Sequence, residues 1–294
     1  MQTTPAVNEM GTLLTISIGL DPTLITLGSL RIAWHGVFTA LGIVAALVLT
    51  ARFARQRQLD PDVVYRVAWW SIPAGIVGAR LLYVVEHLDD FATNWGRVFA
   101  LNEGGISVYG AIVGGATVGF LYTWRSRLPM RQIADAAALG LPIGLAVGRI
   151  GDLINGEHWA KASTLPWAVC YTNPNTLNGD PTTNAVAACG SLSHSPLQPP
   201  AVHPVAGLYE PLLLLVVFAI LWIGFRRLAT PGLLFWIFVI LYAALRFALA
   251  PLRLNETKVG AVSVPQLVAV ASVLVAAAML AVLWWTQPRV LEAT

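Results

Sequence analysis

Residues 232–251 read GLLFWIFVILYAALRFALAP, and Arg246 is the one charged residue in this stretch. A helix that crosses the hydrocarbon core of a bilayer needs about 20 consecutive, mostly apolar residues. The stretch meets that requirement, and it contains no acid that could neutralise its own arginine. It therefore predicts a membrane-spanning helix whose charged side chain has its partner elsewhere.

Other stretches of the chain have the same character. The whole sequence is 56% hydrophobic and 11% charged, with a mean hydropathy of +0.68, whereas soluble proteins carry about 25% charged residues. We expect an all-α integral membrane protein of about seven transmembrane helices, forming a single membrane domain over residues 1–294. Besides 232–251, the predicted spans are 33–51, 67–85, 106–124, 133–153, 207–225 and 263–286.

The positive charges between the spans predict an orientation, because cytoplasmic loops carry an excess of Lys and Arg. One side holds Arg52, Arg55, Arg57, Arg66, Arg125, Arg127, Arg131, Arg226, Arg227 and Arg289. The other side holds half as many: Arg31, Arg97, Lys161, Arg253 and Lys258. This bias places the C-terminus in the cytoplasm and the N-terminus outside.

The connector 154–206 lies outside in this topology, between the fourth and fifth predicted helices. Loops of this length are usually functional or disordered, and Trp159 and Trp167 favour an ordered extracytoplasmic cap. The same connector contains Cys170 and Cys189, the two cysteines of the chain. They either form a disulfide or remain free thiols.

Three arginines fall inside predicted spans: Arg80, Arg149 and Arg246. An ionisable side chain at that depth normally faces the interior of the bundle with a partner, and it marks a functional site by default. The alternatives are structural. Arg80 lies near a helix end, where it could reach the headgroups or form a structural pair. Arg149 could pair with Asp152, three residues along the same helix.

Arg246 needs a partner from another segment, either an acid such as Glu210 or a bound anion. Glu210 also has a simpler explanation, because an acid near a helix N-terminus is favourable by itself. His35 is the one histidine within a predicted span, and an imidazole can act as a general base near neutral pH. Packing is the alternative for His35, and an interfacial tyrosine is the alternative for Tyr109. The sequence contains no metal-binding motif, no nucleophile elbow, no phosphate loop and no basic run suited to nucleic acid.

Five motifs in this order resemble the bacterial prolipoprotein diacylglyceryl transferase family. They are WHG at 34–36, EGGIS at 103–107, GRIGDLINGE at 148–157, HP at 203–204 followed by LYE at 208–210, and LRF at 245–247. Their order and spacing match from about residue 20 to 285, and the block at 148–157 is the specific element. The predicted helix number and orientation agree with that family.

The resemblance implies a multi-pass enzyme of the bacterial plasma (inner) membrane. It would transfer the diacylglyceryl group of phosphatidylglycerol to the lipobox cysteine thiol of a preprolipoprotein and release glycerol phosphate. The expected partners are phosphatidylglycerol, preprolipoprotein signal peptides and membrane lipids, with no cofactor and no nucleic acid. We expect catalytic contributions from His35, Tyr109, Glu210 and Arg246. We expect lipid binding by Arg80, Arg149, Asp152, Asn155, Glu157 and, again, Arg246.

This chain departs from the family pattern at positions near the expected chemistry. His35 stands where many members have tyrosine, and Tyr109 stands where many have histidine, so that the two residue types are exchanged. Asp152 replaces a usual asparagine, and Ala250 replaces a usual acid. One residue is also inserted between His203 and Glu210. If positions 35 and 109 line one cavity, His35 could have taken over as the base.

Two other functions use the same residues. A small-anion transporter or channel could use the arginines as a selectivity site, and it would need a water path to both sides of the membrane. A diverged relative could bind an anionic lipid without catalysis, and Tyr109 and Ala250 are the residues that favour this hypothesis.

Overall fold

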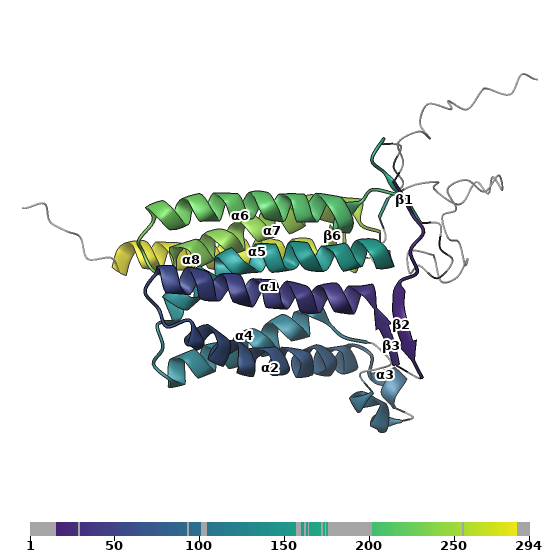
Figure 1. Ribbon diagram of the computed structural model, residues 1–294, viewed down its shortest axis with the longest axis horizontal. Helices are drawn as coiled ribbons and strands as arrows, with labels where there is room; N and C mark the ends of the chain where they lie inside the picture. Colours follow the sequence, from purple (N-terminus) through teal and green to yellow (C-terminus); the bar gives the residue numbers. More distant parts are fainter. Residues whose placement is uncertain are drawn as a thin grey trace, which may run out of the picture.

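Seven long helices run nearly parallel in the part of the chain that the structure describes (Figure 1). The structure is a computed structural model, and it describes residues 16–28, 30–92, 94–100, 105–156, 160–161, 163, 165–171, 173, 175, 202–254 and 256–286. The long helices are α1 (Trp34–Gln56), α2 (Asp62–Glu86), α4 (Val108–Arg125), α5 (Met130–Asn155), α6 (Glu210–Arg227), α7 (Leu233–Leu249) and α8 (Val264–Thr286). Each predicted span overlaps one of them over most of its length.

Six helices of the described residues are long and apolar enough to cross a membrane, which supports the prediction of an all-α, multi-pass membrane protein. Their bounds are Trp34–Gln56, Asp62–Glu86, Met130–Asn155, Val205–Arg227, Leu233–Leu252 and Val264–Thr286. The remaining long helix, α4, has 18 residues, and its apolar character is diluted by several glycines and by Arg125 at its end. The fourth of these spans includes a π-helical turn, η4 (Val205–Tyr209), that leads directly into α6.

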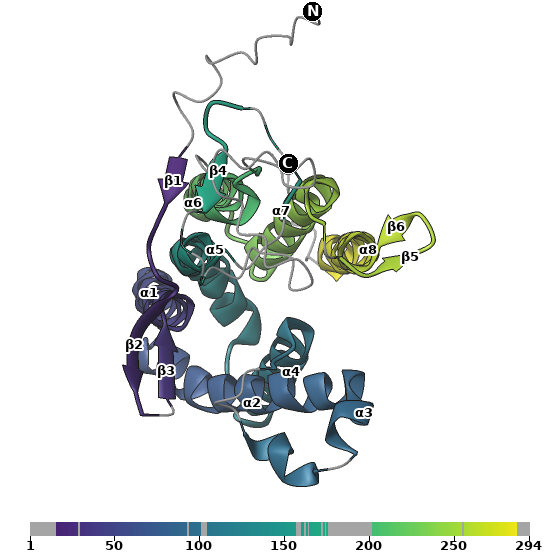
Figure 2. The ribbon, with the colours of Figure 1, turned by 90° about the vertical axis from the view of Figure 1, so that its right-hand side faces the viewer.

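Glycines allow two pairs of helices to approach closely. Between α1 and α5, a Cβ atom on Gly42 would collide with the backbone carbonyl of Gly144. Between α2 and α4, a Cβ atom on Gly78 would collide with the carbonyl of Gly110. Membrane helices associate largely through van der Waals packing, which small residues at the interface improve. Viewed along the helix axes, α2 and α4 form a pair beside the group of α1, α5, α6, α7 and α8 (Figure 2).

Short strands and turns lie at the end of the bundle where α1 begins and α5 ends (Figure 1). Strand β1 (Ile16–Ile18) pairs in parallel with β4 (Val169–Tyr171), and β2 (Thr23–Leu27) pairs antiparallel with β3 (Leu30–Ala33). A third pair, β5 (Lys258–Val259) and β6 (Val262–Ser263), precedes α8. The connectors also form α3 (Leu88–Phe91), η2 (Trp95–Phe99) and η5 (Ala250–Leu252). None of these strands was predicted, because two to five residues are too few for a clear pattern.

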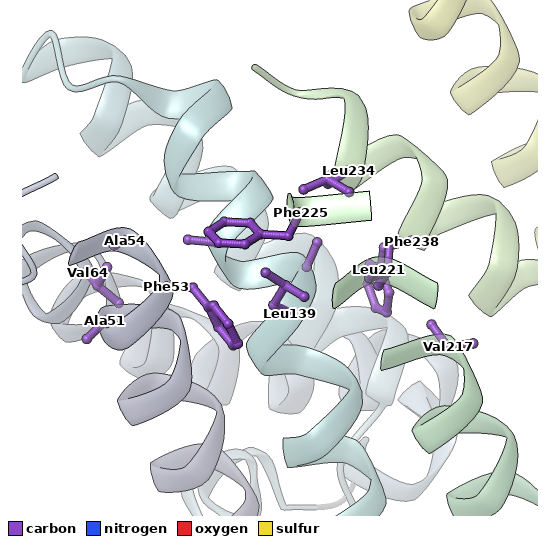
Figure 3. Packing of buried hydrophobic residues seen from close by; sticks show 12 residues of the cluster. Ala51, Phe53, Ala54, Val64, Leu139, Val217, Leu221, Phe225, Leu234 and Phe238 are labelled. Carbon is purple, nitrogen blue, oxygen red and sulfur yellow. The ribbon is translucent and has the colours of Figure 1, made fainter. Parts of the chain in front are cut away.

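The opposite end of α1, α5, α6 and α7 is filled by an apolar cluster (Figure 3). Phe53 of α1 stands edge-on to Phe225 of α6, with the ring centroids 5.3 Å apart. Leu139 and Leu221 are fully buried beside them. This cluster also includes Val64 of α2, so it holds five helices in one arrangement and thereby fixes where their other ends meet.

Candidate active site

Glu210 is the centre of a group of buried charges. It is the first residue of α6, and its side chain is 0% exposed. Arg149 of α5 donates from Nη2 to Oε1 of Glu210 over 2.9 Å. Arg253 donates from Nη2 to the other oxygen over 2.6 Å. Nη1 of Arg246 lies 3.6 Å from Oε1, which agrees with the alternative that pairs Arg246 with an acid such as Glu210.

Asp152 extends this group toward α1. One carboxylate oxygen of Asp152 accepts a hydrogen bond from Arg149, one turn away on the same helix, so the contact of the structural alternative is present. The other oxygen lies 2.6 Å from Nδ1 of His35. The Asp152 side chain is 2% exposed, whereas that of His35 is 37% exposed. An accessible imidazole therefore joins the buried charges through Asp152.

Gly151 makes the contact between His35 and Asp152 possible. A Cβ atom at position 151 would lie 2.7 Å from the Cα atom of His35, a separation that real Cβ contacts do not show. The helices can therefore approach at this level only because residue 151 has no side chain. Asp152, the next residue, then reaches the imidazole directly.

Arg253 and Glu256 join the group from the connector after α7. Oε1 of Glu256 lies 3.9 Å from Nη2 of Arg246 and 3.8 Å from Nε of Arg253. Burial lowers the pKa of Arg253, and the neighbouring Arg246 acts in the same direction, while Glu210 opposes them. The described residues thus bring together three guanidinium groups and three carboxylates.

Neither Arg253 nor Glu256 was predicted as a site residue, and Arg253 was counted among the loop cations. Arg253 follows Arg246 by seven residues, which is about two helical turns. That spacing was the available signal, since it places both residues on one side of a continued helix. Position 250, where an acid is usual, holds alanine here, and Glu256 supplies a carboxylate near Arg246 from further along the chain.

Tyr109 and His35 lie at different parts of this group. Tyr109 is in the first turn of α4 and is 38% exposed. Arg246 and Glu256 lie close enough to act electrostatically on its hydroxyl. His35 instead contacts the group through Asp152, on the side of Arg149. The two exchanged residues therefore approach the arginines through different partners.

Arg80 is not brought together with Arg149 and Arg246. Its guanidinium donates to the backbone carbonyls of Arg97 at 2.5 Å, Val98 at 2.8 Å and Gly105 at 2.8 Å. It also lies 5.3 Å from the ring centroid of Phe91. These contacts fasten the connector between α2 and α4, as the structural alternative for Arg80 proposed.

Two further predicted residues belong to the last turn of α5 and the residues after it. Asn155 is buried at the end of α5, one turn beyond Asp152. Gly156 follows with a φ of +67°, a left-handed conformation that favours glycine and ends the helix. Glu157 lies outside the described residues.

Parts of the connector 154–206 contact the same end of the bundle. The backbone of Ala160 pairs with Arg253. Tyr209 receives a hydrogen bond of 2.9 Å from Nε1 of Trp167, and its hydroxyl lies 3.3 Å from Nδ1 of His203. Tyr171 is buried close to Asp152, and burial together with that carboxylate raises its pKa. Tyr171 was not predicted as a site residue.

From the sequence, Cys170 and Cys189 could form a disulfide or remain free thiols. Cys170 is disulfide-bonded and fully buried in β4, which agrees with the first alternative. Cys189 lies outside the described residues. Among the residues that the structure describes, no group of three His, Cys, Asp or Glu side chains is arranged to hold a metal ion.

Comparison with known proteins gives these residues a context. The model of the prolipoprotein diacylglyceryl transferase family matches residues 22–283. The chain belongs to this family.

Relatives with this family's activity in their names cover most of the chain. A phosphatidylglycerol–prolipoprotein diacylglyceryl transferase of Gloeobacter violaceus is 32% identical over 271 residues, which cover 91% of this chain and 93% of the relative. A protein of the same name from Thermosynechococcus vestitus is 30% identical, covering 84% of this chain and 87% of its own length. Another from Clostridioides difficile is 26% identical, and the match covers 87% of this chain and 92% of the relative. The similarity therefore includes every element that carries the buried charges.

Proposed function

We propose that this chain transfers the diacylglyceryl group of phosphatidylglycerol to the lipobox cysteine thiol of preprolipoproteins. The observation that carries the proposal is the convergence of Arg149, Arg246 and Arg253 on Glu210 in a chain of the transferase family. Guanidinium groups bind phosphate through charge-assisted hydrogen bonds. A buried cluster of them suits a lipid whose headgroup is a phosphodiester.

The reaction forms a carbon–sulfur bond and breaks the carbon–oxygen bond between the diacylglyceryl group and the phosphate. The thiol proton must pass to a base, because the thiolate is the nucleophile. The released glycerol phosphate takes the electron pair of the broken bond and gains negative charge. Arg149 and Arg246 would stabilise this developing charge in a site of low dielectric constant.

The remaining predicted residues receive roles in the same proposal. His35 and Tyr109 are the candidates for proton transfer, and Glu210 holds the arginines in position. Asp152, Asn155 and Glu157 would contribute polar contacts to the lipid site. Arg80 remains a proposed lipid ligand, although its contacts with backbone carbonyls favour a structural role.

The proposal includes the orientation in the plasma (inner) membrane of a bacterium. All seven long helices, α4 included, would cross it, with the N-terminus outside and the C-terminus in the cytoplasm. The site and the cap formed by residues 154–206 would then face outward, where secreted preprolipoproteins arrive. Alkaline phosphatase fused after residue 100 should be active, and fused after residue 127 it should be inactive. Equal activity at both positions would exclude a spanning α4.

The transferase activity is tested with purified protein in micelles that contain phosphatidylglycerol and a synthetic lipobox peptide. Mass spectrometry of the peptide cysteine should show the diacylglyceryl increment. Arg149→Ala should abolish the increment, and Arg52→Ala, a change at an exposed arginine at the opposite end of α1, should retain it. Tight lipid binding without any increment would indicate the non-catalytic relative, and anion flux through liposomes would indicate a transporter.

A further inference from the structure

The His35–Asp152 contact joins two residues that both depart from the family pattern. They are 117 positions apart in the sequence, and α1 and α5 bring Nδ1 of His35 to 2.6 Å from a carboxylate oxygen. Ionised Asp152 can only accept a hydrogen bond, so Nδ1 must carry the proton. The lone pair of a neutral imidazole is then on Nε2.

The carboxylate in this pair is held from several sides. Arg149 donates to its second oxygen. Arg149 also donates from Nη2 to Oε1 of Glu210 over 2.9 Å. The hydroxyl of Tyr171, from β4, lies within electrostatic range of Asp152. Because the arginine favours the ionised form, Asp152 stays an acceptor and cannot rotate without losing that contact. The imidazole is therefore oriented by a group that is itself fixed.

We propose that Asp152 is the positioning residue for His35, which acts as the base that deprotonates the acceptor thiol. This proposal rests on the proposed function. Nε2 takes the proton from the cysteine sulfur, and the imidazolium that results is stabilised by Asp152. The thiolate then forms the bond to the glyceryl carbon while the carbon–oxygen bond breaks. A carboxylate that orients an imidazole and stabilises its charged form is a recurrent arrangement in catalysis by bases.

The same carboxylate connects the two halves of the reaction. One oxygen of Asp152 orients His35, the proposed base. The other oxygen binds Arg149, a proposed phosphate ligand. Asparagine, the usual residue at this position, has one acceptor oxygen and one donor group, so it cannot accept from both partners with separate oxygens. Aspartate at residue 152 can therefore serve His35 and Arg149 at the same time.

The test compares rates of peptide modification at pH 7 and pH 9 in the wild type, Asp152→Asn and His35→Gln. At pH 7, each variant should lose about 100-fold in rate, as expected for loss of general base catalysis. The acceptor thiol has an unperturbed pKa of about 8.5, so it forms about 25-fold more thiolate at pH 9. At pH 9, the loss of rate in each variant relative to the wild type should therefore be at least about tenfold smaller than at pH 7.

Two further measurements separate positioning from folding. The loss in the double variant should be far smaller than the product of the two single losses, because both changes disable the same base. Nitrogen-15 NMR of labelled histidine, with His35→Gln used for assignment, should show the proton of His35 on Nδ1, and Asp152→Asn should remove this preference. Asp135→Asn is the matched control, since Asp135 is a buried acid at the other end of α5, and it should leave the rates unchanged.

Three outcomes overturn the proposal. A deficit of Asp152→Asn that is the same at pH 7 and pH 9 would mean that Asp152 acts through Arg149 alone. Multiplying losses in the double variant would mean that His35 and Asp152 act independently. A wild-type protein that modifies no peptide would overturn the proposed function itself, whatever tautomer His35 shows.

Discussion

The two ends of α5, α6 and α7 are stabilised by different forces. At one end, Leu139, Leu221 and Phe238 belong to the apolar cluster of Figure 3. At the other end, the first residue of α6 is a fully buried glutamate between arginines of α5 and α7. Apolar packing tolerates replacement by side chains of similar volume, whereas a buried ion pair is strongly destabilised when one partner is lost. The apolar core and the proposed site thus lie at opposite ends of these helices, and a different force stabilises each end.

Glu210→Gln should have the largest effect on stability and activity, because it removes the carboxylate that three arginines contact. We expect a loss of about 3–5 kcal/mol in the free energy of unfolding. We also expect at least about 100-fold slower transfer, since the arginines lose their common orientation. Thermal melting in detergent and the peptide assay measure the two effects. Glu86→Gln, a change at an exposed acid at the end of α2, is the control.

Leu221→Ala should affect stability without affecting chemistry. Leu221 is 0% exposed in the apolar cluster, and a cavity of this kind reduces the free energy of unfolding by about 2–5 kcal/mol. Leu215→Ala on the same helix, where the side chain is 47% exposed, should change it far less. Transfer rates measured below both melting temperatures should agree within about twofold. Equal losses of stability in the two variants would contradict the assignment of the core.

Asp135→Ala tests the one carboxylate described within the apolar end. Asp135 accepts hydrogen bonds from the backbone N–H groups of Gly232 at 2.7 Å and Phe235 at 2.9 Å, at the start of α7. Loss of such a cap costs about 1–2 kcal/mol. We expect that decrease in the free energy of unfolding together with an unchanged transfer rate. A larger effect on transfer than on melting would show that the two ends are coupled.

Glu256→Gln should have the smallest effect. Its oxygen is 3.8–3.9 Å from the two guanidinium groups, beyond hydrogen-bonding distance, so it acts through charge alone. We expect transfer about fivefold slower, equivalent to about 1 kcal/mol, with Glu256→Asp closer to the wild type. A loss as large as that of Glu210→Gln would give Glu256 a direct role in the reaction.

Much of this architecture could be predicted from the sequence. Apolar length determines where a membrane helix lies, so each predicted span overlaps a helix over most of its length. Charge within such a span demands a partner, which led to Arg149, Arg246 and the pairing with Glu210. Arg149 and Asp152 are three residues apart, so their contact follows from helical geometry alone.

The remaining features depend on how separate segments approach one another. His35 reaches Asp152 because Gly151 allows α1 to come close, and a single sequence does not reveal the register of two helices. Arg253 and Glu256 belong to a connector whose path returns to the site. Arg80 resembled the other buried arginines in the sequence, and only the structure shows that its partners are the carbonyls of Arg97, Val98 and Gly105.

The distribution of charges among helices has a consequence for biogenesis. Arg149 and Asp152 lie on the same helix and neutralise each other there, so this pair adds no net charge when α5 enters the bilayer. The charges of Glu210 on α6 and Arg246 on α7 lie 3.6 Å apart, and a short connector joins these helices, from Leu228 to Gly232. Insertion of α6 and α7 as a hairpin would bring both charges into lipid already paired. The order of the helices in the chain is therefore suited to delivering these four charges as two pairs.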